Sequence, residues 1–148
     1  MDIRSVGASE LDALLALYEH LHPEDQPLPA RDQIEAVWQA IIANPAHHCF
    51  GLYREAQLVA SCSINLVANL TRGCRPFALI ENVVTHSEHR GCGYGQALLA
   101  YAKAFAWDQG CYKVMLMTSS KDPATLRFYE TAGFDRHDKQ AFIAKPPA

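Results

Sequence analysis

The sequence is poor in clustered positive charge. Lys and Arg together number 13 against 16 Asp and Glu, the formal net charge is -3, and no run of three Lys or Arg residues occurs. Nucleic acids and anionic membranes bind to basic faces, so we expect neither as a partner. No apolar stretch approaches the length of a membrane span, and residues 1–10 show no charged-then-apolar leader. We therefore expect a cytoplasmic protein.

Metal-binding and disulfide patterns are also missing. The five cysteines are odd in number, scattered, and never spaced as Cys-x-x-Cys, which fits reduced thiols better than a disulfide framework or a zinc site. Two histidine pairs occur, His47-His48 and His86-x-x-His89, but neither lies in an acidic or thiol cluster with ligand spacing. We expect loop and strand-end histidines and no metal.

The sequence does contain enough apolar residues for one core. Of its 148 residues, 49% are hydrophobic and 20% are charged, which is the balance of a soluble globular domain. No repeat, low-complexity tract or linker interrupts it. We expect one domain over residues 1–148.

Hydrophobic periodicity predicts alternating helices and strands. Helical spacing covers about 9–21, 32–43, 95–107 and 123–132, with Ser9 and Asp12 as the expected cap of the first helix and Asp122 as the cap of the last. Strand patterns cover 49–53, 58–68, 77–85, 114–118 and 142–144. The order ααβββαβαβ predicts an α/β (α+β) fold, with a mixed, mostly antiparallel central sheet and helices on both faces.

A glycine-rich segment follows soon after the apolar run 77–84 and leads into a helical pattern. It consists of Arg90, Gly91, Cys92, Gly93, Tyr94, Gly95 and Gln96. A strand that turns through glycine into a helix leaves several N–H groups without internal partners, and the helix dipole adds about half a positive charge there. Because glycine also lets phosphate oxygens approach the backbone closely, the segment predicts a bound phosphorylated cofactor.

Two other phosphate-binding loops fit this segment poorly. A nucleotide-triphosphatase loop places Lys-Ser/Thr after its glycines, where this chain has Gln96-Ala97. A dinucleotide fingerprint spaces its glycines as G-x-G-x-x-G, whereas the spacing here is G-x-G-x-G.

Two motifs together resemble the GCN5-related N-acetyltransferases (GNAT), which acetylate amines with acetyl-CoA. The first is Arg90-x-x-Gly93-x-Gly95 followed by Ala97-Leu98-Leu99, and the second is the segment LRFYETAGF at residues 126–134. Residues 80–84 and 108–114 are locally most similar to the glucosamine-phosphate N-acetyltransferase branch. The resemblance implies the GNAT acyltransferase fold and acetyl-CoA as co-substrate. Dimers are common in the family, so it is also compatible with a homodimer.

The resemblance also implies roles for individual residues. The segment from Arg90 to Gln96 would bind the coenzyme A pyrophosphate through backbone N–H groups, with Arg90 screening its charge. Val83, Val84 and Thr85 would lie beside the pantetheine arm and pair with its amides as an added strand would. Tyr129, in the second motif, would donate a proton to the departing thiolate.

Two further residues are candidates from their chemistry. Glu81 is an acid inside an otherwise apolar strand, and because buried carboxylates are costly unless used or paired, we expect it to be a general base or a structural hydrogen-bonding acid. Cys92 is a candidate acyl-carrying nucleophile, but no base lies near it in sequence, so we expect it simply to pack.

These residues predict direct acetyl transfer to a primary amine in a ternary complex. Glu81 would accept the ammonium proton, a backbone N–H near Val84 would stabilise the oxyanion, and Tyr129 would protonate the thiolate. Two alternatives are a non-catalytic acyl-CoA-binding domain on the same fold and an acetyltransferase for protein amines. Arg72 and Arg75 could meet an anionic acceptor, although we expect them to form a solvated loop.

Overall fold

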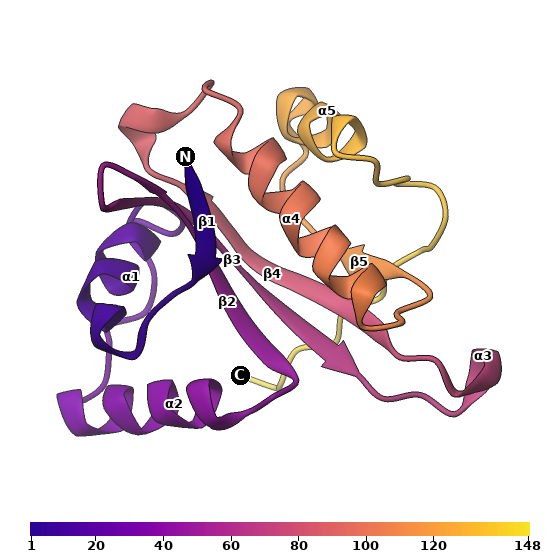
Figure 1. Cartoon of the computed structure of the whole chain (residues 1–148), viewed down its shortest axis with the longest axis horizontal. Helices are drawn as coiled ribbons and strands as arrows, with labels where there is room; N and C mark the ends of the chain where they lie inside the picture. The colour runs from indigo at the N-terminus through magenta and orange to yellow at the C-terminus, as the bar shows by residue number, and fades with distance from the viewer. The chain divides into compact units, whose positions relative to one another are not determined.

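A five-stranded sheet forms the centre of the larger of two compact units in this protein. The computed structural model describes the whole chain, residues 1–148, and the two units are Met1–Leu116 and Met117–Ala148. Its strands lie in sequence order: β1 (Asp2–Ser5), β2 (His47–Arg54), β3 (Gln57–Val67), β4 (Phe77–Thr85) and β5 (Val114–Leu116). β1 to β4 pair antiparallel, and β4 pairs parallel with β5 (Figure 1). The predicted mixed, mostly antiparallel sheet is therefore confirmed.

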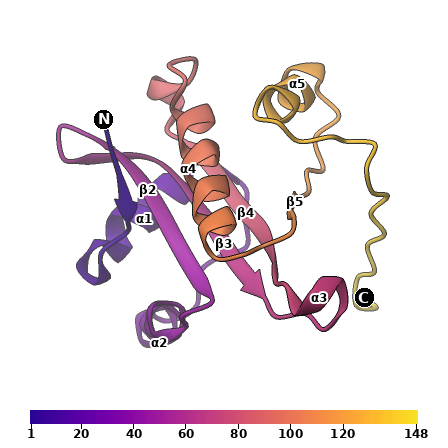
Figure 2. The same cartoon turned by 45° about the vertical axis from the view of Figure 1, so that its right-hand side comes forward.

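Helices cover both faces of this sheet, as expected. They are α1 (Leu11–Tyr18), α2 (Arg31–Ala43) and α4 (Tyr94–Asp108). The connections also contain the four-residue α3 (Thr71–Cys74) and the short 3-10 turns η1 (Ala8–Glu10) and η2 (Ser87–His89). α1 and α2 lie on one face, and α4 crosses the other as the link between β4 and β5 (Figure 2). A parallel strand pair needs such a crossover, because a tight turn cannot join two parallel strands.

Successive side chains of β2 pack on opposite faces of the sheet. Cys49 belongs to the core cluster that α1 and α2 build, which includes Leu14 and Trp38. The next residue, Phe50, faces α4, where its ring lies 5.0 Å from Tyr101 and 5.1 Å from Phe105, measured between ring centroids. This period of two shows that β2 is buried on both sides.

Trp38 offers a test of the α2 packing. Its side chain is 4% exposed, and its indole N–H donates to the Ala8 carbonyl at 3.0 Å. We expect Trp38→Phe to lower the free energy of unfolding by about 1–3 kcal/mol, because the part-buried hydrogen bond to the Ala8 carbonyl is lost and the smaller ring fills less of the core. The neighbouring Val37 is 60% exposed, so Val37→Ala should change stability by less than about 0.5 kcal/mol. Equal effects of the two substitutions in urea unfolding would contradict this packing.

Two strand predictions need correction. β1 was not expected, because three of its four residues are exposed and it joins the sheet edge through backbone pairing with residues Phe50–Tyr53. Conversely, residues 142–144 were expected to form the last strand, but they have no regular structure, and Phe142 and Ile143 are 90% and 69% exposed. The sheet therefore gains a strand at the N-terminus and lacks the expected one near the C-terminus.

The start of the first helical segment also differs from expectation. Gly7 precedes the η1 turn, and the Glu10 carboxylate accepts from the Gly7 N–H at 2.8 Å, so Ser9 is not the cap. Asp12 instead accepts a hydrogen bond from Arg31 at 2.6 Å. Glu10 thus performs the reach-back expected of Asp12, two residues earlier in the chain.

The second unit contains one helix, α5 (Pro123–Thr131). Asp122 caps it as predicted, since its carboxylate accepts from the Ala124 N–H at 3.0 Å and Pro123 occupies the first turn. The helix ends before Gly133, whose φ is 95°. Across the chain, no helix combines the length and apolar character that a membrane crossing requires.

Candidate functional site

The glycine segment forms a loop between η2 and the first turn of α4. Gly91 and Gly93 have φ values of 76° and 81°, and a Cβ atom at either position would meet no other atom within 4 Å. The glycines are therefore required by backbone conformation and not by crowding. Gly93 caps α4, and its carbonyl accepts the bond from Ala97 N–H at 3.1 Å. The positive end of a 15-residue helix thus opens onto this loop, as the sequence predicts.

The helix start is held in place by the residues that follow the glycines. Gly95 is buried, and Tyr94 and Gln96 are half-buried. The guanidinium of Arg54, at the end of β2, lies 5.7 Å from the centroid of the Tyr94 ring. This arrangement fixes the first turn of α4 against the β2–β3 hairpin.

Arg90 is fastened to the protein on two sides. Its Nε donates to the Thr85 carbonyl at 3.2 Å, and one terminal nitrogen donates to the His20 carbonyl at 3.0 Å. The side chain therefore ties the loop both to the end of β4 and to the turn after α1. The resemblance implied that Arg90 screens the charge of the pyrophosphate, and the sequence gave no sign of this anchoring role.

Cys92 is exposed, so the expectation that it packs into the protein is wrong. Its thiol points to the Arg90 carbonyl, with Sγ 3.8 Å from the oxygen, and no basic side chain contacts it. All five cysteines are free, and burial raises the pKa of Cys62 to about 12, which keeps that core thiol protonated. No group of three or more His, Cys, Asp or Glu side chains is arranged to hold a metal ion.

Three histidines, two of them flagged in the sequence, surround the turn that leads into the loop. The His20 and His86 rings lie 4.0 Å apart, and those of His86 and His89 lie 5.4 Å apart, between centroids. The N–H of Ser87 donates to His20 Nδ1 at 3.4 Å, and the N–H of Glu88 donates to His86 Nδ1 at 3.2 Å. These are loop and strand-end histidines, as expected, and they attach the η2 turn to α1.

A β-bulge interrupts β4 in its second half. Ser63 of β3 pairs with Glu81, but Ser61 pairs with Val84, so β4 contains one residue more than β3 over this stretch. Asn82, inside the bulge, has a φ of 54°. A bulge bends its strand and increases the local twist. The sequence carries a signal only in hindsight, since Asn tolerates this left-handed conformation better than most residues.

Beyond the bulge, the outer edge of β4 is open. β5 pairs with β4 only from Ala78 to Ile80, and no strand pairs with the outer edge after that. The N–H of His86 donates to the Val59 carbonyl at 2.8 Å. Because successive residues of a strand point their polar groups to opposite edges, Val84 faces β3, whereas Val83 and Thr85 face the open edge. The Thr85 carbonyl bonds to Arg90, which leaves Val83 as the residue that offers both polar groups.

Glu81 is exposed, so the premise that its carboxylate is buried is wrong. The reason is the shortness of β5, whose last residue, Leu116, pairs with Ile80. Glu81 follows directly and lies where the sheet edge opens. Its carboxylate is thus placed beside the open edge without the burial that the apolar strand suggested.

The second motif lies in the second unit. Tyr129 is half-buried on α5, and its ring lies 5.0 Å from Phe128 and 6.5 Å from Phe134, between centroids. The neighbouring Glu130 is exposed and pairs with Arg136 at 3.4 Å. Aromatic contacts thus hold the Tyr129 ring, while Glu130 is a surface charge.

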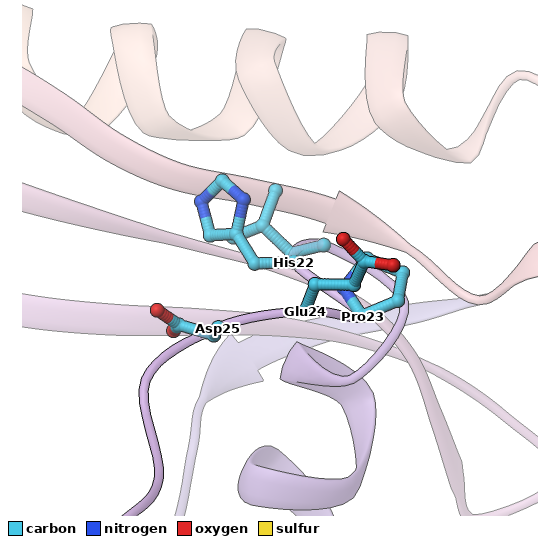
Figure 3. Close-up of a pocket in the computed structure, with 5 residues that line it drawn as sticks. His22, Pro23, Glu24 and Asp25 are labelled. Carbon is cyan, nitrogen blue, oxygen red and sulfur yellow. The ribbon is translucent and has the colours of Figure 1, made fainter.

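A pocket of about 510 Å³ lies in the loop after α1, and it is lined by Leu21, His22, Pro23, Glu24 and Asp25. Figure 3 shows the carboxylates of Glu24 and Asp25 pointing in different directions, so they do not form one site for an ammonium group. Glu81 does not line this pocket. This pocket therefore does not contain the candidate base.

Comparison with known proteins identifies the family. The model of the acetyltransferase (GNAT) family matches residues 11–134. The chain belongs to the GNAT family. It is 32% identical over 140 residues to a glucosamine 6-phosphate N-acetyltransferase of Trypanosoma brucei brucei, covering 95% of this chain and 92% of that protein. It is 29% identical to an aminoglycoside N(6')-acetyltransferase type 1 of Serratia marcescens, covering 91% of this chain and 92% of that protein.

A solved structure supports the same assignment. A protein of Agrobacterium tumefaciens strain C58, assigned to the acetyltransferases, superposes with a TM-score of 0.90 at 39% sequence identity, covering 98% of this chain and 100% of that one. This GNAT protein is therefore an enzyme, an N-acetyltransferase that uses acetyl-CoA. The alternative of a non-catalytic acyl-CoA-binding domain is set aside.

Proposed function

We propose that this enzyme transfers the acetyl group of acetyl-CoA directly to a primary amine of a small amino sugar. The observation that carries the proposal is the open edge of β4, which runs from Glu81 to the glycine loop in one continuous segment. The amino-sugar class rests on the two relatives named above, whose names refer to glucosamine 6-phosphate and to aminoglycosides. We further propose that both compact units belong to one acetyltransferase domain, since the family match spans them.

The loop and the edge suit the two parts of coenzyme A. Backbone N–H groups and the positive end of α4 complement a pyrophosphate, and the space above Gly91 and Gly93 is clear of other atoms. The outward C=O of Val83 and the N–H of Thr85 can pair with an extended chain of amides such as the pantetheine arm. The backbone polar groups of Val84 face β3, so Val84 would not pair with the pantetheine arm. Its side chain is buried.

Acetyl-CoA supplies the acetyl group as a thioester, and the protein handles protons and charge. Glu81 would accept the proton of the incoming ammonium, directly or through water. The N–H of Val83, next to Val84, would stabilise the oxyanion. Tyr129 would then donate a proton to the departing sulfur. No covalent enzyme intermediate is required, so the exposed Cys92 thiol has no part in the reaction.

The reaction is proposed for the cytoplasm. Five free cysteines suit a reducing compartment.

A panel of amines tests the function. We expect acceptor-dependent release of coenzyme A thiol with amino sugars, and much slower release with amino acids, polyamines and short peptides. Release with peptides alone would overturn the small-molecule assignment and favour a protein acetyltransferase.

Glu81→Gln tests the base. Below the pKa of its amine an amino sugar is mostly protonated and needs a base, so we expect kcat/KM in that range to fall about 10²-fold in the variant. The loss should shrink as the pH rises above the pKa of the acceptor amine, because the free amine then needs no base. Glu88→Gln is the matched control, because it removes an exposed carboxylate that lies outside β4, in η2. This variant should leave the pH profile unchanged. Identical profiles for the two variants would remove Glu81 from the mechanism.

A further inference from the structure

Three cationic side chains surround one aromatic ring at the end of the sheet away from the glycine loop. The charged ends of Arg72, Arg75 and Lys113 lie 5.8, 5.7 and 5.2 Å from the centroid of the Tyr112 ring. We refer to these four residues as the Tyr112 cluster. It lies where β4 and β5 begin, beside α3, whereas the glycine loop follows the other end of β4 (Figure 1). The cluster is therefore separate from the loop proposed for the pyrophosphate.

Backbone hydrogen bonds fix the segments that carry the cluster. The N–H of Tyr112 donates to the Pro76 carbonyl at 3.0 Å, and the N–H of Ala78 donates to the Lys113 carbonyl at 3.1 Å. Arg75 Nε also donates to the Arg72 carbonyl at 3.2 Å. The backbone that carries Tyr112 and Lys113, and the Arg75 side chain, are thus held before any ligand arrives, which lowers the entropic cost of binding.

The positive charge of the cluster is not neutralised by the protein. None of its three cations forms an ion pair with an Asp or Glu, whereas the ion pairs of the chain involve Arg4, Arg31 and Arg136. Gathering like charges is unfavourable unless an anion relieves it. A guanidinium that lies against a ring keeps the N–H donors of its edge available, and that edge matches phosphate oxygens in pairs. The cluster therefore fits a phosphate better than a single carboxylate.

The cluster and the candidate base share one strand. Phe77, whose ring lies 5.1 Å from Lys113 Nζ, and Glu81 are four residues apart on β4 and on the same face before the bulge. Four residues of strand span about 13 Å, and long Arg and Lys side chains can reach across part of that distance. We propose that the acceptor is a phosphorylated primary amine whose phosphate binds to the Tyr112 cluster while its amine lies at Glu81. This proposal rests on the proposed function, acetyl transfer to a small amine.

Paired substrates test the cluster. We expect wild-type enzyme to acetylate glucosamine 6-phosphate with a kcat/KM at least 10²-fold above that for glucosamine, mainly through a lower KM. Arg75→Gln and Lys113→Gln should each reduce this preference about 10-fold, the loss of one charge-assisted contact. Their kcat/KM for glucosamine should stay within about twofold of wild type, which also shows that the variants fold.

Arg4→Gln is the matched control. Its guanidinium also lies over a tyrosine, 3.8 Å from the Tyr53 centroid, but its charge is already paired with Glu10. We expect this variant to keep the phosphate preference. Equal use of the two sugars by wild type, or a preference that survives in both cluster variants, would overturn the proposal while leaving acetyl transfer intact.

Glucose 6-phosphate separates this proposal from the proposed function. It carries the phosphate but no amine, so it should inhibit competitively and bind in calorimetry, about 10-fold more weakly to Arg75→Gln. If no amine of any kind is acetylated, the proposed function fails by itself. If glucose 6-phosphate binds both forms equally or neither form, the cluster is not a phosphate site.

Discussion

Tyr129→Phe is expected to lower kcat by about 10²–10⁴-fold while leaving the affinity for acetyl-CoA within about twofold of wild type. The substitution keeps the ring, and with it the contacts to Phe128 and Phe134, and removes only the hydroxyl. If that hydroxyl supplies the proton to the departing sulfur, the thiolate must leave unprotonated in the variant. Steady-state kinetics, combined with calorimetric titration of acetyl-CoA, measures both quantities.

Two controls sharpen this test. Tyr101→Phe makes the same change in α4, where the ring packs on Phe50, and should leave kcat unchanged. An acyl donor whose thiol has a lower pKa releases a thiolate that depends less on protonation by Tyr129. With such a donor, Tyr129→Phe should lower kcat by a smaller factor. An unchanged kcat for Tyr129→Phe would remove this tyrosine from the mechanism.

Gly93→Val is expected to weaken acetyl-CoA binding at least 10²-fold. Gly93 has a φ of 81°, and holding a branched side chain in that conformation costs about 1–3 kcal/mol. The loop should relax to another conformation, which turns its N–H groups away from the phosphates. Since one hydrogen bond to a charged group contributes about 1.5–3 kcal/mol, losing two such bonds accounts for the predicted change.

Gly110→Val separates this effect from a general loss of stability. Gly110 lies just beyond the other end of α4, has the same φ of 81°, and also has no atom within 4 Å of a Cβ position. The two variants should therefore lose similar stability in thermal unfolding. Only Gly93→Val should lose acetyl-CoA affinity in calorimetry, and equal affinities would contradict the role of the loop.

The features that the sequence predicted well are those with local causes. β4 was placed at its observed residues because an apolar run bounded by Pro76 and the glycine loop is a local signal. The glycine loop was predicted because positive φ values at Gly91 and Gly93 require that residue type. Asp122 was identified as a cap because the contact it makes spans only two residues.

The features that the sequence did not predict depend on distant partners. β1 pairs with a strand more than forty residues away through its backbone, so its side chains carry no pattern. Glu81 is exposed because β5 stops at Leu116, and strand length is not encoded near Glu81. The anchoring of Arg90 to the His20 carbonyl joins residues seventy positions apart. Each of these concerns pairing between segments, which local periodicity does not describe.

A two-substrate initial-velocity matrix tests the central claim, direct transfer from acetyl-CoA to an amine. With glucosamine 6-phosphate varied at several fixed concentrations of acetyl-CoA, we predict acceptor-dependent thiol release and double-reciprocal lines that intersect, as a ternary complex requires. Parallel lines would show that the acetyl group first passes to the enzyme, with the exposed Cys92 as the first residue to examine. That result would contradict direct transfer and the roles proposed for the open edge of β4.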